Sequence, residues 1–396
     1  MIPHIRKEYN ARFTREKYRA FLNEIATAAN YRPTFPIAET PVFLPPYLIR
    51  LIMEATDEVT GVLCRPDFRQ LSEGAMRPEF FVPGETNHPA FVCIDFGICE
   101  SADGSLIPQL IEVQGFPSLF YYQNITANAY RHHFDIPGDM DHLFGNITEE
   151  VYFDLLRRII VGGAKPENVV LLDIDPYSQN TQVDFWAASR ALGIKVICLS
   201  DLKTAGKDVF YINEDGKKIA VERIFNRVIF DELIRHAHLK REFYFQKEYN
   251  IHWVGHPNWF LRISKHTLPF FNSRFVPPSF YLNDENLPTD LDHYVLKPLF
   301  SFSGQGVIIG PSEADLAAIP VEQRHNYILQ KKVSYARSVE TPDGPAMAEF
   351  RVMMAWEEEA ENPVALTNLV RLSKGKMVGV RYNKGKTWVG GSVGFF

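Results

Sequence analysis

The sequence has few cysteines, no long apolar run and no excess of basic residues. Its 396 residues contain four cysteines and no Cys-x-x-Cys pair, so we expect reduced thiols and not a disulfide framework. No uninterrupted apolar stretch approaches the roughly 20 residues that cross a bilayer. The amino-terminal residues also lack the apolar segment of a secretion signal. These absences predict a cytoplasmic protein with no membrane partner.

The charge balance argues against nucleic acid as the main partner. Lys and Arg total 42 against 48 Asp and Glu, which gives a formal net charge of −6 at pH 7. Nucleic-acid-binding proteins usually carry a basic patch, and this sequence has no long Lys/Arg run. Hydrophobic residues at 46% and charged residues at 23% are typical of a soluble globular protein. The length suffices for two or three domains.

The middle of the chain has the clearest secondary-structure pattern. Residues 169–174 form a continuous apolar run, as in a strand buried on both faces. A helix is predicted over 181–192, with Asn180 as N-cap and Gly193 as C-cap. A second strand follows over 195–199. Together these elements predict a βαβ unit.

Other elements are predicted on both sides of this unit. Apolar residues at helical spacing predict a helix over 13–28, and an apolar helix is expected near Tyr47–Met53. Short runs bounded by Gly, Pro and Asp turns predict strands. These strands are 89–99, 106–113, 209–213, 218–224, 293–297, 306–309, 327–333, 348–356, 364–372 and 377–382.

Lys297 is a candidate phosphate ligand. It lies in an apolar strand and is followed by the Ser/Gly-rich loop 303–306. A lysine in such a strand is costly to desolvate without an anionic partner, and the amides of the loop can form an anion nest. Lysine and nest together would suit nucleotide phosphates. The alternative is an edge strand whose lysine points into solvent.

Glu112 and Gln114 are candidate metal ligands. Residues two apart share one face of a strand, so these side chains can offer two oxygens to one site, and Asp95 on the preceding strand could reach the same face. Oxygen ligands of this kind suit Mg²⁺. The alternative is a surface strand with alternating polar residues.

The carboxyl-terminal region combines cations with small residues. Glu349 and Arg351 open one strand, Arg371 ends another, and Lys374 and Lys376 follow. The chain then ends with the glycine-rich stretch 389–394, which could be a loop that closes over a polyanion. An ordinary tight turn near the terminus is the alternative.

In this order the motifs resemble those of the circularly permuted ATP-grasp ligases, most closely eukaryotic-type glutathione synthetase and more distantly glutathionylspermidine synthetase. Those enzymes have an early Glu-x-Asn metal motif, a central Rossmann-like substrate domain, and a late Lys-Pro with a Gly-rich loop. An adenine-binding strand and a closing loop follow. The similar stretches here are Glu112–Gln114, 168–199, Lys297-Pro298 with 303–306, 327–333, and 388–394, and the resemblance covers about residues 90–396.

The resemblance implies an α/β (α+β) protein with a circularly permuted ATP-grasp fold and an inserted Rossmann-like βαβ substrate domain. Residues 1–160 would form the amino-terminal part of the ATP-grasp core with the metal-binding strand. Residues 161–254 would form the substrate domain, and residues 255–396 would carry the nucleotide-binding strands and the closing loop. The related ligases are often dimers, so a homodimer is one assembly that the resemblance implies.

The resemblance also implies roles for individual residues. Mg²⁺ would be held by Asp95, Glu112 and Gln114. Contacts to ATP would come from Lys265, Lys297, Ser303, Gly304, Gly306, Gln330, Lys331, Lys332, Val333 and Glu349. Substrate contacts would come from Arg227, Arg371, Gly390 and Gly391. Of these residues, Lys297, Ser303 and Arg371 would act in catalysis.

The sequence departs from the pattern of glutathione synthetase at several of these places. Cys93 stands where the pattern Arg-x-Asp has its arginine, and Ser301 stands where a metal-binding Glu is expected. Gln114 replaces Asn, while Pro117 and Leu119 replace small polar residues that contact the peptide substrate. A lost cation matters, because phosphoryl transfer depends on positioning and charge stabilisation. We therefore do not expect glutathione as the product.

The resemblance implies an ATP- and Mg²⁺-dependent carboxylate–amine ligase. ATP would phosphorylate the carboxylate of a small acid, and an amine would attack the acyl phosphate to give an amide, ADP and phosphate. Two alternatives stay open. One is an ATP-dependent phosphotransferase, which would release a stable phosphorylated product. The other is a nucleotide- or metabolite-binding protein that has lost catalysis, which Cys93 and Ser301 favour. The sequence identifies neither the acid nor the amine.

Overall fold

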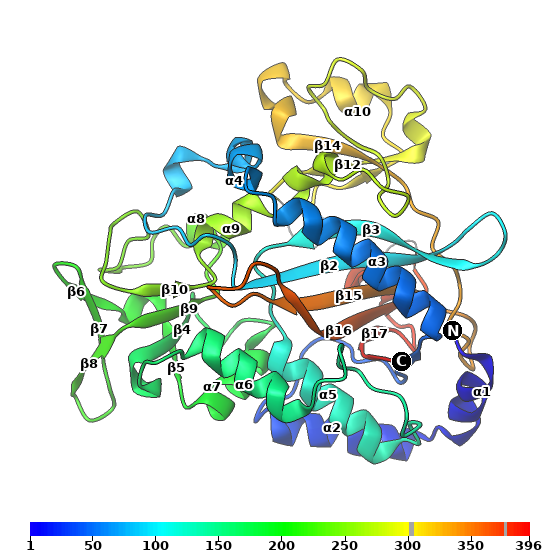
Figure 1. Ribbon diagram of the computed structural model, residues 1–396, viewed down its shortest axis with the longest axis horizontal. Helices are drawn as coiled ribbons and strands as arrows, with labels where there is room; N and C mark the ends of the chain where they lie inside the picture. Colours follow the sequence, from blue (N-terminus) through cyan, green and yellow to red (C-terminus); the bar gives the residue numbers. More distant parts are fainter. Residues whose placement is uncertain (301–304, 376–377) are drawn as a thin grey trace.

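The structure is a computed structural model that describes residues 1–300, 305–375 and 378–396. The described residues form a mixed α/β fold with several separate sheets, as in an α+β protein. Figure 1 shows a central sheet, a second sheet at its left end and a smaller upper lobe. No helix in these ranges is long and apolar enough to cross a membrane, and all four cysteines are free thiols.

The central sheet joins strands from distant parts of the chain. It is antiparallel throughout and has the order β17-β16-β15-β2-β3. Its strands are β2 (Phe91–Glu100), β3 (Leu106–Gln114), β15 (Met347–Ala355), β16 (Val364–Ser373) and β17 (Gly390–Ser392). β2 therefore lies between its hairpin partner β3 and the distant strand β15.

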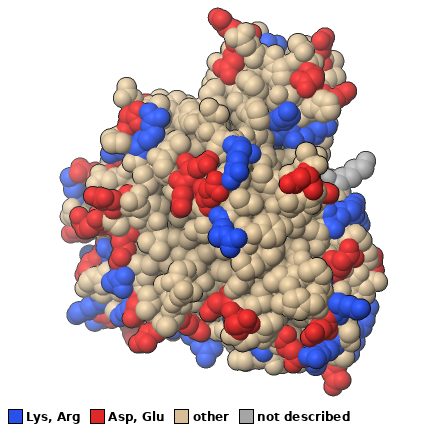
Figure 2. All heavy atoms as spheres, turned by 45° about the vertical axis from the view of Figure 1, so that its right-hand side comes forward, with Lys and Arg blue, Asp and Glu red and all other residues tan. Residues whose placement is uncertain are grey.

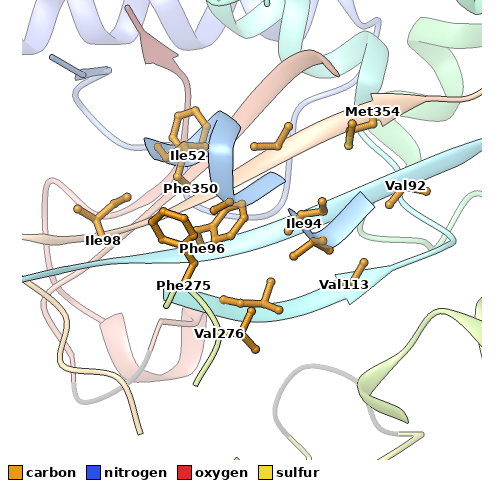
Figure 3. Close-up of a cluster of buried hydrophobic side chains, with 14 of the residues drawn as sticks. Ile52, Val92, Ile94, Phe96, Ile98, Val113, Phe275, Val276, Phe350 and Met354 are labelled. Carbon is orange, nitrogen blue, oxygen red and sulfur yellow. The ribbon is translucent and has the colours of Figure 1, made fainter. Parts of the chain in front are cut away.

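One face of the central sheet packs against α3 (Pro46–Leu63). The helix starts at a proline, which is favoured at the first helical position. Its buried residues recur every three or four positions and meet the apolar side chains of β2 and β15. Figure 3 shows this core, with labelled side chains from α3, β2, β3, β15 and residues 275–276 pointing toward one another. Burying each such side chain contributes about 1.5–3 kcal/mol.

The opposite face of the central sheet is only half apolar. Near one end, Cys93, Met353 and Leu369 pack against α5 (Phe120–His133) and α6 (Glu149–Ile160). Toward the other end, the same face carries acidic and basic side chains, which form the candidate site. Neither α5 nor α6 was predicted from the sequence.

The second sheet is parallel and has the order β10-β9-β4-β5. Its strands are β4 (Val169–Asp173), β5 (Lys195–Cys198), β9 (Arg223–Asn226) and β10 (His252–Val254). Helix α7 (Gln182–Leu192) connects β4 to β5, and every residue of β4 is buried, so the predicted βαβ unit is confirmed. The C-cap is Gly193 with a φ of 73°, as predicted, whereas the N-cap is Thr181 and not Asn180.

The upper lobe contains a four-stranded antiparallel sheet with the order β11-β14-β12-β13. Its strands are β11 (Ser279–Tyr281), β12 (Tyr294–Pro298), β13 (Ile308–Ile309) and β14 (Tyr327–Lys331). Residues on one face of β12 and β14 form a small core with α10 (Glu313–Ala317). In Figure 2 this lobe projects from the body, and Lys and Arg are interspersed with Asp and Glu on the face shown.

The remaining elements lie around these sheets. The helices are α1 (Pro3–Arg12), α2 (Arg15–Ala28), α4 (Phe68–Leu71), α8 (Phe230–Arg235) and α9 (Pro257–Arg262). The strands are β1 (Val42–Phe43), β6 (Lys203–Ala205), β7 (Asp208–Ile212), β8 (Lys218–Val221) and β18 (Gly394–Phe395). β1 pairs with β18, which brings the two ends of the chain together.

Two predictions for the carboxyl-terminal region are wrong. Residues 380–383 form a 3-10 helix, although a strand was predicted over 377–382. The stretch 389–394, predicted as a closing loop, supplies the edge strand β17 and the start of β18. The cause is the amino-terminal segment, because Gly391 donates its N–H to Pro36 O and accepts from Ala38 N.

The close approach of Pro36 to β17 favours glycine at position 390. Its φ is 122°, and a Cβ placed there would lie 2.7 Å from the carbonyl carbon of Pro36. We expect Gly390→Ala to lower the free energy of unfolding by about 2–3 kcal/mol through strain and overlap. The control is Gly61 in α3, where an added Cβ would meet nothing within 4 Å, and Gly61→Ala should raise stability by about 0.5–1 kcal/mol. Equal urea midpoints for the two variants would contradict this packing.

Candidate functional site

The polar half of the central sheet gathers side chains from four strands. Asp95 of β2 lies opposite Glu112 of β3 and opposite Arg351 of β15. Glu349 of β15 lies opposite Arg371 of β16. A β-bulge between Asp95 and Phe96 shifts the register with β3. This bulge lets β3 present Glu112 to the site while it keeps Leu110 in the core.

Asp95 is the centre of this group. Its carboxylate has no exposed surface. It accepts from Arg351 Nε at 2.6 Å on Oδ1 and from Arg351 Nη2 at 2.7 Å on Oδ2, and Arg371 Nη2 also donates to Oδ2. Burial alone raises the pKa of Asp95, but the two guanidinium groups outweigh it and hold that pKa below its usual value. The charge-assisted bidentate geometry fixes Arg351 in one orientation.

Glu349 extends the network toward the upper lobe. Arg371 Nη2 forms an ion pair with Glu349 Oε1, and Tyr335 Oη donates to Oε2 at 2.8 Å. The ring of Tyr335 lies over Gly97, where a Cβ would approach it to 2.8 Å. Burial raises the pKa of Glu349 although Arg371 opposes the shift. Only glycine at position 97 leaves room for this contact.

Lys297 reaches the same region from the upper lobe. Its Nζ donates to Gln330 Oε1, and Gln330 Nε2 donates to Leu110 O of β3 at 3.3 Å. Burial lowers the pKa of Lys297 to about 8, partly against the attraction of Glu112 and with the help of Lys265. Burial also lowers the pKa of Lys265, again opposed by Glu112. Two desolvated ammonium groups and one carboxylate therefore share this space.

Arg227 approaches from the parallel sheet. It follows β9 at the edge where the strand order reverses between β4 and β9, the usual ligand crevice of such sheets. Its Nη1 donates to Pro117 O at 2.7 Å, and its guanidinium lies 4.5 Å from the Phe116 ring centroid. Burial lowers the pKa of Arg227, although Asp173 opposes the shift. The Nε atoms of Arg227 and Arg371 are buried with no hydrogen-bond partner in the described part of the chain.

Cys93 lies among these arginines. Burial raises the pKa of its thiol to about 12, and Arg351, Arg371 and Arg227 all oppose that shift. The thiol is therefore neutral at physiological pH. The guanidinium of Arg351 nevertheless lies near this thiol. Arg351 belongs to the neighbouring strand β15, two residues before Met353, which lies opposite Cys93.

The metal prediction concerns Asp95, Glu112 and Gln114. Both oxygens of Asp95 accept from arginines, and Gln114 Nε2 donates to Glu112 Oε1 at 2.5 Å. Within the described ranges, no three His, Cys, Asp or Glu side chains form a cluster that could hold a metal ion. Glu112 is thus the carboxylate of this face that no arginine or lysine pairs with directly among the described residues.

The structure brings together many of the predicted site residues. Those in the network just described are Asp95, Glu112, Gln114, Lys297, Gln330, Glu349 and Arg371, with Lys265 and Arg227 at its borders. Lys331 and Lys332 are exposed, and Val333 is half-buried. Gly306 has a φ of 72° beside Pro298. The predicted Ser303 and Gly304, and also Ser301 and Lys376, lie outside the described residues.

Two other predicted residues have their backbone groups engaged elsewhere. Gly390 and Gly391 lie in β17, where Gly391 is opposite Arg371, and the amide and carbonyl of Gly391 bond to the 36–38 segment. Sequence reasoning assigned no role of their own to Arg351 and Tyr335. A signal for Arg351 was present, because it follows Glu349 by two residues in an otherwise apolar strand and so shares its face.

Comparison with known proteins gives structural neighbours only. No family model matches the chain, and no curated protein is similar in sequence. A glutathione synthetase-like effector from Globodera pallida, solved in the apo form, is similar with a TM-score of 0.53 and 12% identity, covering 90% of this chain and 94% of that one. A protein from Methylobacillus flagellatus KT, assigned as a gamma-glutamylcysteine synthetase, has a TM-score of 0.39 and 12% identity, with 87% and 86% coverage. At this identity the first likeness supports a similar fold.

The ion pairs of Asp95 predict a large stability effect at Arg351. We expect Arg351→Met to lower the free energy of unfolding by about 3 kcal/mol, because the buried carboxylate loses its bidentate partner. Arg12→Met, which removes an exposed pair with Asp135, should change stability little. Adding Asp95→Asn to Arg351→Met should restore part of the loss. Urea unfolding measures all three, and an Arg351→Met loss no larger than that of Arg12→Met would contradict the arrangement.

Proposed function

We propose that this protein is an ATP- and Mg²⁺-dependent ligase of the circularly permuted ATP-grasp type, which joins a small carboxylic acid to an amine. One observation carries the proposal. Lys297, Lys265, Arg371 and Arg351 all interact electrostatically with Glu112, the carboxylate of the site that has no ion-pair partner among the described residues, between the central sheet and the upper lobe. Cations on the central sheet and on the sheet of the upper lobe suit a nucleoside triphosphate held between the two.

The cations of the site are suited to phosphate groups. Lys297 donates to the neutral amide of Gln330, and Glu112 attracts it without forming a direct ion pair among the described residues. A phosphate oxygen would give this desolvated ammonium a direct anionic partner. The buried Nε of Arg371 also lacks a partner in the described part of the chain. Phosphate oxygens would satisfy both groups. The half-buried Val333, next to the exposed Lys331 and Lys332, stays our proposal for the adenine contact.

Magnesium would be held by Glu112 together with the phosphates. Mg²⁺ in nucleotide sites usually takes one or two carboxylates, phosphate oxygens and waters, so the absence of a three-carboxylate cluster in the described ranges is compatible with it. We assign Gln114 to orienting Glu112, to which it donates at 2.5 Å. Asp95 would act by holding Arg351 and Arg371, since both of its oxygens accept hydrogen bonds from these arginines.

The residues of the chain would work by positioning and charge stabilisation. Bound ATP supplies the phosphoryl group that turns a carboxylate into an acylating group. Lys265 and Lys297 would bind the phosphates, and Arg371 would neutralise the charge that develops on transfer. Arg227 would hold the acid at the crevice of the parallel sheet. Arg351 would provide the cation that the resemblance expects at position 93, where Cys93 stays neutral.

A binding-only protein is the second candidate. The observations that favour it are the neutral thiol of Cys93 within the arginine cluster and the fact that, among the described residues, Glu112 is the one carboxylate of the site without an ion-pair partner. It predicts nucleotide binding without phosphate release. The two candidates therefore differ in turnover and not in affinity.

Thermal unfolding with ATP and Mg²⁺, with ATP and EDTA, and without ligand tests nucleotide binding. A ligand at a hundredfold excess over its Kd stabilises the folded state by about 2.7 kcal/mol. We expect a Mg²⁺-dependent rise in Tm for the wild type and for Lys217→Met, an exposed lysine in a distant turn. The rise should shrink in Lys297→Met and Glu112→Gln.

The outcomes separate the candidates. No rise for the wild type at millimolar ATP would contradict the proposal. A rise that persists in EDTA would favour the binding-only protein. Phosphate release in the presence of acid and amine panels would then distinguish a ligase from a protein that only binds.

The pKa of Lys297 also predicts how nucleotide affinity changes with pH. The free ammonium loses its proton as pH rises through about 8, so ADP should bind best below that pH. We expect calorimetric affinity to fall by about tenfold from pH 7 to pH 9.5. Lys297→Met should bind more weakly at pH 7 and show little further loss, whereas Lys217→Met should behave as wild type. A flat wild-type profile would contradict the phosphate role of Lys297.

A further inference from the structure

A cavity lies at the opposite end of the same strands from the candidate site. It has a volume of about 500 Å³ and is formed where the loop after β15 approaches the first residues of β9 and β10 and the end of α6. Cavities of this size are typical of small-molecule sites. The function proposed above does not use it.

The cavity is separate from the candidate site. On the paired strands β2 and β15, Phe91 lies opposite Ala355 at the cavity end, and Asp95 lies opposite Arg351 at the site end. Four residues of strand span about 13 Å. The same number of residues separates Arg223, which opens β9 and lines the cavity, from Arg227, which follows that strand.

The inner wall of the cavity is cationic. Arg223 donates through Nε to Ile160 O at 3.1 Å and through Nη2 to Ile159 O at 2.8 Å, so the end of α6 holds its guanidinium in place and these bonds leave Nη1 unused. Gly162 leaves space beside it, since a Cβ there would lie 3.2 Å from Nη1. His252 lies next to Arg223, and its Nε2 is 3.5 Å from Glu358 Oε2. A carboxylate would find donors here.

The rim of the cavity is acidic, and one wall is apolar. Glu357 pairs with Arg158 at 2.8 Å, while Glu359 has no ion-pair partner in the described part of the chain. Trp356 stacks on His88 with ring centroids 4.2 Å apart. The side chains of Ala90, Ile159 and Val254 continue this wall. The cavity thus offers the guanidinium of Arg223 inside, carboxylates at the mouth and an apolar surface between them.

We propose that this cavity binds a free α-amino acid with an apolar side chain. Its carboxylate would bind Arg223 and His252, its ammonium group would face Glu358 and Glu359, and its side chain would pack on the wall beside Trp356. Both signs of charge are present and lie on different elements, which suits a zwitterion better than a simple anion or cation. This inference stands apart from the proposed nucleotide site.

Calorimetry with three matched probes tests the charge requirement. The probes are L-phenylalanine, 3-phenylpropionate, which lacks the ammonium group, and 2-phenylethylamine, which lacks the carboxylate. We expect L-phenylalanine to bind at least tenfold more tightly than either of the others. No binding of L-phenylalanine at millimolar concentration, or equal binding of 2-phenylethylamine, would overturn the proposal.

Three variants locate the binding, and a fourth, Glu359→Gln, tests the charge requirement. Ala360→Phe fills the mouth of the cavity and should abolish binding, while Ala317→Phe, on the exposed side of α10, should leave it unchanged. Arg371→Met alters the nucleotide site and should also leave it unchanged. Binding that survives Ala360→Phe but is lost in Arg371→Met would place the amino acid in the nucleotide site and overturn the proposal. Glu359→Gln, which keeps the shape, should weaken L-phenylalanine and leave 3-phenylpropionate unaffected.

Discussion

The buried carboxylate of Asp95 is the group on which the central sheet depends. A carboxylate without exposed surface costs several kcal/mol to desolvate, and it is stable only with well-placed partners. Those partners, Arg351 and Arg371, lie 256 and 276 residues away on β15 and β16. A slip of one residue in β2 would turn Asp95 into the apolar core under α3. The ion pairs therefore fix the register of β2 against β15, two strands that are far apart in the sequence.

The same ion pairs shape the chemistry of the site. They hold two guanidinium groups near the neutral thiol of Cys93, and these groups neutralise the negative charge of Asp95. Glu349 is also paired, so Glu112 is the carboxylate that faces Lys297 and Lys265. Because Asp95 and Glu349 are paired with arginines, the lysines of the site remain suited to an anionic ligand. This reasoning joins the fold of the sheet to the proposed binding of nucleotide phosphates.

Local patterns in the sequence were enough for much of the fold. The apolar run of β4, the glycine after α7 and the turn-bounded runs of β2 and β3 each depend on neighbouring residues, and the structure confirms them. The edge strand β17 could not be found this way, because its glycines pair with a segment near Pro36.

The role of Asp95 could not be predicted from local patterns either. An acidic residue on a strand is equally consistent with a metal ligand or an ion-pair partner until the strand beside it is known. Arg351 was visible in the sequence, but only the pairing of β15 with β2 shows what it holds.

A crystal structure of the wild-type protein with ADP and Mg²⁺ tests the central claim most directly. The account predicts phosphate oxygens within hydrogen-bond distance of Lys297 Nζ, a metal ion coordinated by Glu112, and Asp95 still paired with Arg351. Nucleotide bound elsewhere would contradict it. So would a metal ion coordinated by Asp95 after its arginines had moved away, because Asp95 would then be a ligand and not the anchor of the site.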